Sequence, residues 1–233
     1  MGDLGTFAVT AAVICVLALV AKFIRQHFEK KRTEELQMIA QSMGLEFGTH
    51  TPLYAQNLLF TLNLPLFNQG RSKTIYNLMY GSDGATESMV FDYKYTTGSG
   101  KKQQTAHFTI ALMRSPQLDL PSFTLRPERF GDRILSAFGR QDIDFSDHPE
   151  FSRSYLLRGP EEAVRAVFHE HVLTWFQGQP GLLVQGDDQD LIVLRSKPGR
   201  IRVGEVRELF EQSFQLFSLM RQRRPSAVPC LVN

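Results

Sequence analysis

Residues 4–21 read LGTFAVTAAVICVLALVA, an apolar stretch without a charged residue that is followed at once by basic ones. A helix rises about 1.5 Å per residue and a bilayer core of about 30 Å needs about 20 apolar residues, so this stretch, extended by Phe23 and Ile24, is just long enough to span a membrane. We therefore predict a transmembrane anchor over residues 1–25. Its expected membrane-spanning side chains are Leu4, Phe7, Val13, Ile14, Leu17, Leu19 and Val20.

A cleaved signal peptide is the main alternative to a retained anchor. Such a peptide has a basic N-terminal region and a small-residue cleavage site. Here residues 1–3 are Met-Gly-Asp, and residues 19–21, Leu-Val-Ala, only loosely resemble the cleavage pattern. A buried core helix would not explain why basic residues gather on one side of the stretch alone, so we expect the anchor to be retained.

Charge on the two sides of the anchor predicts its orientation. No Lys or Arg precedes the apolar stretch, whereas five basic residues follow it: Lys22, Arg25, Lys30, Lys31 and Arg32. Because Lys and Arg accumulate on the cytoplasmic side of membrane spans, we expect a single-pass protein of the inner membrane with its N-terminus outside and its domain in the cytoplasm. The lipid bilayer is then the first expected partner, and the basic cluster would lie near anionic headgroups.

Composition narrows the remaining possibilities. The net charge of +2 over 233 residues is too small to indicate nucleic-acid binding. Cys15 falls in the apolar stretch and Cys230 near the C-terminus, so neither a disulfide framework nor a cysteine-based zinc site is expected. We predict no cofactor.

A second helix is expected directly after the anchor, over residues 26–44. Leu36, Ile39, Ala40 and Met43 recur at helical spacing on an otherwise charged surface, and Gly44 suits the left-handed residue that ends a helix. The pattern fits either a stalk that continues the membrane helix or a first helix docked on the domain.

The clearest local structure is a hairpin of residues 88–97 and 105–113, because apolar residues alternate in both arms. One arm places Met89, Phe91, Tyr93 and Tyr95 on one face, and the other places Ala106, Phe108, Ile110 and Leu112 on one face. Pairing Phe91 with Phe108 brings both apolar sets together. In that register Asp92 faces His107, and we predict a cross-strand pair between them.

After the hairpin, a strand that ends in Leu-Arg precedes a helix three times. The strands are expected at residues 123–128, 155–158 and 191–195, and the helices at 130–138, 161–176 and 204–221. Proline and acidic residues at helix starts explain the similarity as well as an internal repeat would. A second hairpin is expected around residues 186–190.

The last two predicted helices are amphipathic and should pack on a sheet. One stripe comprises Val164, Val167, Phe168, His171, Val172 and Trp175, and the other Val206, Leu209, Phe210, Phe214, Phe217 and Met220. Together these features predict an α+β domain over residues 45–221, built of antiparallel hairpins against amphipathic helices, with a loose tail over residues 222–233.

Residues 142–148, Asp-Ile-Asp-Phe-Ser-Asp-His, form the densest group of potential metal ligands. Asp142 and Asp144 alternate with apolar residues and His148 closes the segment. A calcium loop starting at Asp142 would need Gly at its sixth position and Glu at its twelfth, where this chain has Asp147 and Arg153. We therefore expect turn and helix capping here and no metal site.

Two further motifs indicate ordinary structure. Residues 98–101, Gly-Ser-Gly-Lys, lack the spacing of a phosphate-binding loop and are followed by a strand, so we interpret them as a hairpin turn. His169 and His171 lie two residues apart on a predicted helix and point to different faces. We expect His171 to be a hydrogen-bonded residue at the edge of the core.

Several short motifs carry a resemblance to a known family. They are Phe-Asp-Tyr-Lys-Tyr-Thr at 91–96, Gly-Ser-Gly-Lys at 98–101, Leu-Arg-Pro-Glu at 125–128, Asp-Ile-Asp-Phe at 142–145, and the His-Pro, Phe-Ser, Tyr and Gly residues at 148–149, 151–152, 155 and 159. Together they resemble an uncharacterised family of bacterial single-pass membrane proteins, a domain of unknown function, over roughly residues 40–200. The resemblance implies an anchor plus an α+β domain and brings no activity with it.

The leading functional hypothesis is a non-enzymatic interaction or scaffold module at the membrane, with another membrane or cytoplasmic protein as its partner. The alternative is a membrane-tethered hydrolase or anion-binding enzyme. Its candidate polar residues are Asp92, His107, Asp142, Asp144 and His148. A concave site that gathers them would favour the enzyme, and dispersion over the molecule would favour the module.

Overall fold

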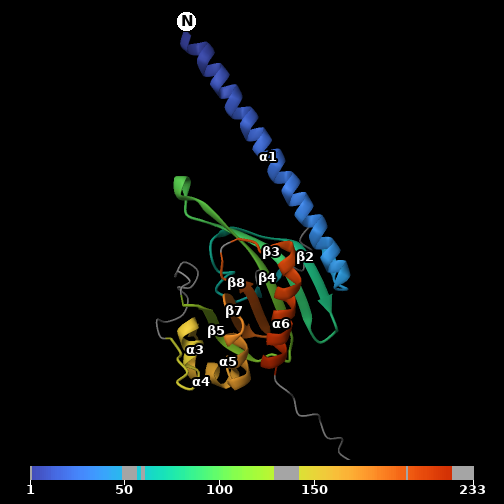
Figure 1. Cartoon of the computed structure of the whole chain (residues 1–233), viewed down its shortest axis with the longest axis vertical. Coiled ribbons are helices and arrows are strands. Elements are labelled where there is room, and N and C mark those ends of the chain that lie inside the picture. The colour runs from blue at the N-terminus through green and yellow to red at the C-terminus, as the bar shows by residue number, and fades with distance from the viewer. Residues whose placement is uncertain (1, 49–56, 59–60, 129–141, 198, 222–233) are drawn as a thin grey trace, which may run out of the picture.

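The computed structural model describes residues 2–48, 57–58, 61–128, 142–197 and 199–221. Its first element is one unbroken helix, α1 (Gly2–Ser42), which joins the predicted anchor to the predicted second helix. The N-terminal part of α1 stands clear of the domain and its C-terminal part lies against it (Figure 1). Leu36 and Ala40 are buried there, and Gly44 takes the left-handed conformation with φ +70°. The helix is thus both a stalk and a docked element.

The exposed part of α1 is long and apolar enough to cross a membrane, with a mean hydropathy of 1.8 in its most apolar window. The side chains of Val13, Ile14, Leu17, Leu19 and Val20 are exposed, as a lipid-facing surface requires. Those of the other two expected spanning residues, Leu4 and Phe7, lie outside the described part of the structure.

The domain is built on one eight-stranded antiparallel sheet in the order β1-β2-β3-β4-β8-β7-β5-β6. The strands β1 to β4 follow each other along the chain. Strand β8 pairs with β4 and so joins them to β7, β5 and β6. The strands are β1 (Glu46–Gly48), β2 (Arg71–Ser82), β3 (Glu87–Thr97), β4 (Gln104–Arg114), β5 (Leu120–Pro127), β6 (Tyr155–Arg158), β7 (Leu182–Asp188) and β8 (Asp190–Arg195).

Helices and buried residues from α1 cover one face of this sheet (Figure 1). The predicted α+β fold, with antiparallel hairpins packed against amphipathic helices, is therefore confirmed. The other face carries a second apolar cluster, covered by Leu58, Leu62, Leu64, Leu66 and Phe67. Besides α1, the helices are α3 (Pro149–Ser154), α4 (Glu161–Val167), α5 (Glu170–Gln177) and α6 (Val206–Met220), with short 3-10 turns at Gly100–Lys102 and Val203–Glu205.

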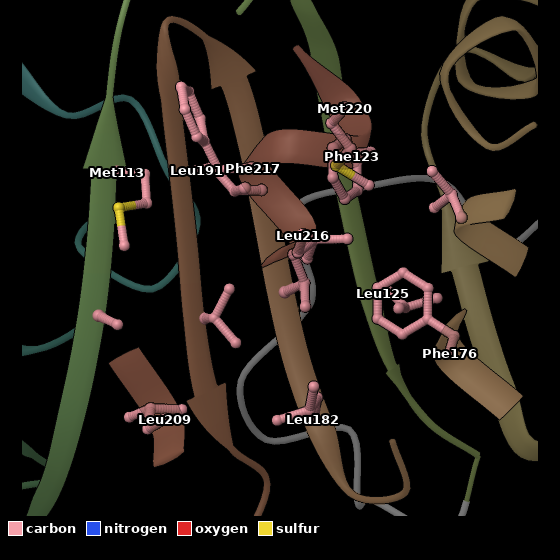
Figure 2. Packing of buried hydrophobic residues seen from close by; sticks show 14 of the residues in the cluster. Met113, Phe123, Leu125, Phe176, Leu182, Leu191, Leu209, Leu216, Phe217 and Met220 are labelled. Carbon is pink, nitrogen blue, oxygen red and sulfur yellow. The ribbon is translucent and has the colours of Figure 1, made fainter. Parts of the chain in front are cut away.

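Helix α6 fills the centre of the helical face (Figure 2). Its Leu216, Phe217 and Met220 pack among side chains from the sheet, including Met113 and Leu191. The predicted stripe was wrong at one position of α6, because Phe214 is 48% exposed while Phe217 is 2% exposed. The buried face of α6 instead includes Gln212, Ser213 and Leu216, so it is rotated about the helix axis from the predicted stripe.

The region predicted as one helix over residues 161–176 forms two. The backbone turns at Phe168, where ψ is 58°, and His169 occupies the N-cap of α5. His171 is exposed, so its predicted place at the core edge was wrong. The break lets Phe168 and Phe176 stack with ring centroids 6.0 Å apart, which buries both rings.

The predicted hairpin exists with its faces as expected, but its register was wrong by two residues. Phe91 pairs with Ile110, and Phe108 pairs with Tyr93. The connection between the strands contains the 3-10 turn Gly100–Lys102 and Gln103. Its centre therefore lies one residue later than predicted, and each residue of β3 pairs two residues farther along β4. Side-chain direction has a period of two, so the apolar faces survive this shift. Asp92 therefore pairs with Thr109, not with His107.

The second hairpin has a tighter turn than predicted, because β7 continues to Asp188. Gly186 lies inside the strand and serves packing. A Cβ there would be 2.3 Å from Cε1 of Phe123, so only glycine leaves room for that ring. The predicted helix at residues 130–138 and the tail at 222–233 lie outside the described residues.

Candidate functional site at the junction of helix and sheet

The most unusual polar group in the described chain is Asp92, a carboxylate on β3 that is only 1% exposed. The alternation of β3 turns Asp92 toward the helical face, beneath α1. Its oxygens accept four hydrogen bonds. They come from Arg32 Nε (2.8 Å), Arg32 Nη2 (2.8 Å), Asn77 Nδ2 (3.0 Å) and Thr109 Oγ1 (2.7 Å). Such saturation is what permits a charged carboxylate to remain buried.

Arg32 reaches this carboxylate from α1 with its side chain 12% exposed. Its two bonds to Asp92 form a bidentate pair, and Nη1 donates to the carbonyl oxygen of Ile201 at 2.9 Å. Nη2 also lies 3.2 Å from Thr109 Oγ1. One guanidinium thus joins the helix, the sheet and the segment before α6.

A second bidentate pair lies one helical turn earlier on α1. The guanidinium of Arg200 donates to both Glu29 oxygens, at 2.6 and 2.7 Å, and lies 3.7 Å from Asp92 Oδ2. It also stands over the ring of Tyr76, 5.9 Å from the centroid. We call Glu29, Arg32, Asp92 and Arg200 the junction cluster.

Local backbone geometry prepares β2 for this contact. Asn77 has φ +52°, and the pairing of β2 with β3 shifts register between Tyr76 and Met79. This bulge turns the Asn77 amide toward the junction, where it donates to Asp92 and accepts a 2.9 Å bond from the Thr33 hydroxyl. Bulges re-aim side chains in this way at the cost of one ladder position.

The cluster changes the acidity of its members. The hydrogen bond from Arg200 is the main reason that the pKa of Glu29 is lowered. Burial raises the pKa of Tyr76 to about 12, with the nearby Asp92 carboxylate adding to the effect. Burial, followed by the charges of Arg200 and Lys94, lowers the pKa of His107, whose Nδ1 lies 3.1 Å from the Tyr76 hydroxyl. Near neutral pH these shifts favour an ionised Glu29 paired with Arg200 and neutral forms of Tyr76 and His107.

The five basic residues that follow the apolar stretch have different surroundings. Arg32 points into the domain, whereas Lys22 and Arg25 are exposed. Lys30 and Lys31 are exposed and form surface pairs with Glu34 and Glu35, one helical turn on. Among these residues, Arg32 therefore belongs to the junction and not to the lipid-facing surface.

The Asp142 to His148 segment lies far from the junction, beside the edge strand β6. The Asp142 carboxylate accepts bonds from the backbone N–H groups of Ile143 (2.9 Å) and Leu157 (2.8 Å), so it extends the sheet edge. Burial raises the pKa of Asp142. Asp144 is exposed, and His148 is the N-cap residue of α3 without a side-chain cap bond. Within the described residues, no group of three His, Cys, Asp or Glu side chains is arranged to hold a metal ion.

The five candidate polar residues thus form two groups, one in the middle of the sheet and one at its β6 edge. Asp92 and His107 lie on β3 and β4, while the other three adjoin β6. Sequence reasoning singled out Asp92 and Arg32 separately and missed that they meet. The available signal was a lone acid at an inward position of a strand, which requires a buried cation for compensation.

A cavity of about 610 Å³ opens beside the junction. It is bordered by basic side chains, including Arg195, Arg200 and Arg202, and by Glu205 and Glu208. Arg195 is paired with Glu208 at 2.7 Å and Arg200 with Glu29. These pairs offset the charges of Arg195 and Arg200, while the lining also contains Lys197.

No protein-family model and no curated protein sequence matches the chain. Among solved structures, it is similar to the crystal structure of the mycobacterial trehalose monomycolate transport factor A, TtfA. The TM-score is 0.53 and the identity 11%, over 83% of this chain and 98% of that one. At this identity the likeness concerns the fold alone. A mycobacterial neighbour is consistent with the bacterial family that the sequence resembles, and membership of that family stays a prediction.

Proposed function

We propose that the protein is a single-pass membrane protein whose α+β domain serves, at the cytoplasmic face, as a non-enzymatic module that binds another membrane protein. One observation carries this proposal: an unbroken helix runs from the exposed apolar segment into the junction cluster. A domain held this way keeps one face toward the bilayer. That arrangement suits a module that must meet a partner in the same membrane.

Two further observations support this function. The structural neighbour is named a transport factor, a name that mentions transport and no reaction. The candidate catalytic groups are also divided between the middle of the sheet and its β6 edge, and the hydrogen-bonding sites of Asp92 are filled by other residues of the chain. A general base needs a free lone pair that reaches the substrate. The module is therefore favoured over the tethered hydrolase or anion-binding enzyme.

Orientation is tested by labelling single cysteines in intact spheroplasts, after Cys15 and Cys230 are replaced by Ser. We expect a membrane-impermeant maleimide to label Asp3→Cys and to leave Gln189→Cys, on the exposed turn of the second hairpin, unlabelled until the cells are permeabilised. Labelling of Gln189→Cys in intact spheroplasts would contradict the cytoplasmic assignment.

The partner is tested by placing a photo-crosslinking amino acid at exposed positions of the full-length protein in cells. Phe214 on α6 and Met38 on α1 are suitable, since they are 48% and 60% exposed. Crosslinking to one discrete membrane protein supports the module. Crosslinks to lipid alone from both positions, together with turnover of a phosphate or carboxylate ester that His107→Gln abolishes without changing the melting temperature, would favour the enzyme.

A further inference from the structure

We infer that the tip of the β3–β4 hairpin is a second membrane contact, which binds the anionic headgroups of the bilayer that α1 enters. The contact surface is formed by Arg71 and Lys73 at the start of β2 and by Lys101 and Lys102 in the 3-10 turn. We call these four residues the basic tip. The inference rests on α1 crossing the membrane, which is part of the proposed function, but not on which side the domain faces.

The charge of this region is one-sided. All four side chains of the basic tip belong to exposed residues. The sequence contains no Asp or Glu between Asp92 and Asp119, nor over residues 61–82, so both segments that build the tip lack acidic neighbours. The whole chain, by comparison, is nearly balanced, with 26 Lys and Arg against 24 Asp and Glu. Positive charge has been gathered at this end of the hairpin.

The tip is held in a defined shape. Arg71 donates to the carbonyl oxygen of Gly98 and, at 3.2 Å, to Oε1 of Gln103, which ties β2 to both sides of the turn. Gly98 has φ +71°, and a Cβ there would lie 2.4 Å from the carbonyl oxygen of Lys102. The turn therefore presents Lys101 and Lys102 outward from a fixed backbone. A preorganised cationic turn loses less conformational entropy when it meets a charged surface.

The hairpin projects beyond the sheet toward the same end of the molecule as the N-terminal half of α1 (Figure 1). The Arg32–Asp92 contact gives both elements a common origin. Ten residues of helix from Arg32 to Lys22 span about 15 Å. Five residues of strand from Asp92 to Thr97 span about 17 Å, and the turn that carries Lys101 and Lys102 extends beyond them.

The basic tip therefore lies about level with the segment from Lys22 to Arg25, where the predicted span meets the headgroups. At that level the lipid surface is the nearest partner for the basic tip, which has no acidic residue beside it. Clusters of Lys and Arg beside a membrane helix bind phosphatidylserine-type or phosphatidylglycerol-type headgroups, and the attraction decays within a Debye length. An anionic bilayer is thus the partner that fits both the charge and the position.

The test places full-length protein in nanodiscs of pure phosphatidylcholine or of phosphatidylcholine with 30% phosphatidylglycerol. An environment-sensitive fluorophore is attached to Ser99→Cys, in the turn itself, in a chain with Cys15 and Cys230 replaced by Ser. A second label at Gln189→Cys, in the β7–β8 turn beside the end of β4 that is farthest from the tip, is the positional control. Both leaflets are identical, so the reading is independent of orientation.

We expect the emission of the Ser99 label to shift to shorter wavelength in the phosphatidylglycerol discs and to return at 0.5 M salt. The emission of the Gln189 label should not shift. In Lys101→Gln/Lys102→Gln, the ratio of lipid-contacting to water-exposed label should fall roughly 25-fold, about five-fold for each lysine. Arg153→Gln/Arg221→Gln removes the same charge from exposed residues outside the tip and should leave the ratio unchanged.

Equal emission from Ser99 in both kinds of disc would overturn the inference, as would an equal effect of the two double variants. Failure of the proposed anchor is a separate result, because the protein would then not co-elute with phosphatidylcholine discs at all. The four substituted side chains are exposed, and unchanged melting temperatures would show that both double variants remain folded.

Discussion

The Arg32–Asp92 pair is nearly cut off from water, with side chains 12% and 1% exposed. Burying two charges costs on the order of several kcal/mol per ion. Their attraction recovers this cost only when the remaining hydrogen-bonding sites are filled. Here Asn77 and Thr109 fill the carboxylate sites. The pair therefore contributes to the specificity of docking more than to net stability, because only one placement of α1 satisfies both charges.

Replacing Asp92 by Ala should destabilise the domain by about 3–5 kcal/mol, because the Arg32 guanidinium would remain largely buried without its anion. The double variant Arg32→Met/Asp92→Leu should recover most of that loss. Urea unfolding followed by Trp175, the one tryptophan in the chain, measures both.

Glu34→Ala serves as the control for the pair, since it breaks an exposed ion pair with Lys30 and should change the free energy of unfolding by less than about 1 kcal/mol. A loss for Asp92→Ala as small as this would show that the junction is hydrated and loosely formed.

His107 should make stability depend on pH below neutrality. Its folded-state pKa lies below the ordinary value of 6.5, so between these two values the unfolded chain binds more protons. The stabilising contribution is complete above pH 6.5 and is lost as the pH falls through that window. We expect His107→Gln to lose less stability than the unmodified protein between pH 7.5 and 5.5, as measured by urea unfolding at each pH. Parallel profiles would contradict this.

At the scale of single elements, α6 shows how burial selects among residues of one helical stripe. Phe217 packs against the sheet, whereas Phe214 is about half exposed to solvent (Figure 2 shows the packed side). Phe217→Ala should cost about 3–5 kcal/mol through lost burial and an unfilled cavity. Phe214→Ala should change stability by about 0.5 kcal/mol or less. Equal costs for the two variants, in the same urea titration, would mean that α6 is rotated from the position described.

Helix α1 acts as one rigid element because nothing interrupts it between the apolar segment and the junction cluster. Replacing Gln26 and His27 by Gly should create a hinge above Glu29, since each glycine costs a helix about 1 kcal/mol relative to alanine. The matched control replaces both by Ala.

In nanodiscs, fluorescence anisotropy from a label at Gln189→Cys should decay faster in the glycine variant, with the domain melting unchanged. Identical decays in the glycine and alanine variants would show that other contacts, such as the basic tip, hold the domain.

At the scale of the whole molecule, β8 joins two halves of the sheet, β1 to β4 on one side and β5 to β7 on the other. Its residues Leu191 to Leu194 pair with β4, and Arg114 forms a bidentate pair with Asp190 at 2.6 and 2.7 Å. The second apolar cluster also mixes the halves, because Leu183 and Ile192 pack there with residues of β2 to β4. Neither half has a core of its own.

We therefore expect the domain to unfold in one transition. Trp175 fluorescence reports the second half, and the fluorescence of a label at Thr86→Cys, the buried residue at the end of the turn before β3, reports the first. The two urea curves should coincide, as they do for cooperative domains. Separate midpoints for the two probes would show that the β4–β8 seam opens before either half unfolds.

Properties that depend on a few neighbouring residues were predictable from the sequence. The apolar run of residues 4–21 predicted a helix that could enter a membrane, and alternation predicted which residues of the β3–β4 hairpin share a face. The orientation of the anchor is another sequence prediction, and it awaits the labelling experiment. These features follow from chain periodicity and from transfer of side chains out of water, which act locally.

Only the tertiary structure decided which distant residues meet. Arg32 and Asp92 are 60 positions apart and Glu29 and Arg200 are 171 apart, so no local pattern could pair them. The hairpin register depended on how the turn accommodates Gln103. The break at Phe168 depended on the stacking of the Phe168 and Phe176 rings in the core. Long-range pairs form where the whole sheet brings charges together and excludes water, and that condition is a property of the folded molecule and not of any segment.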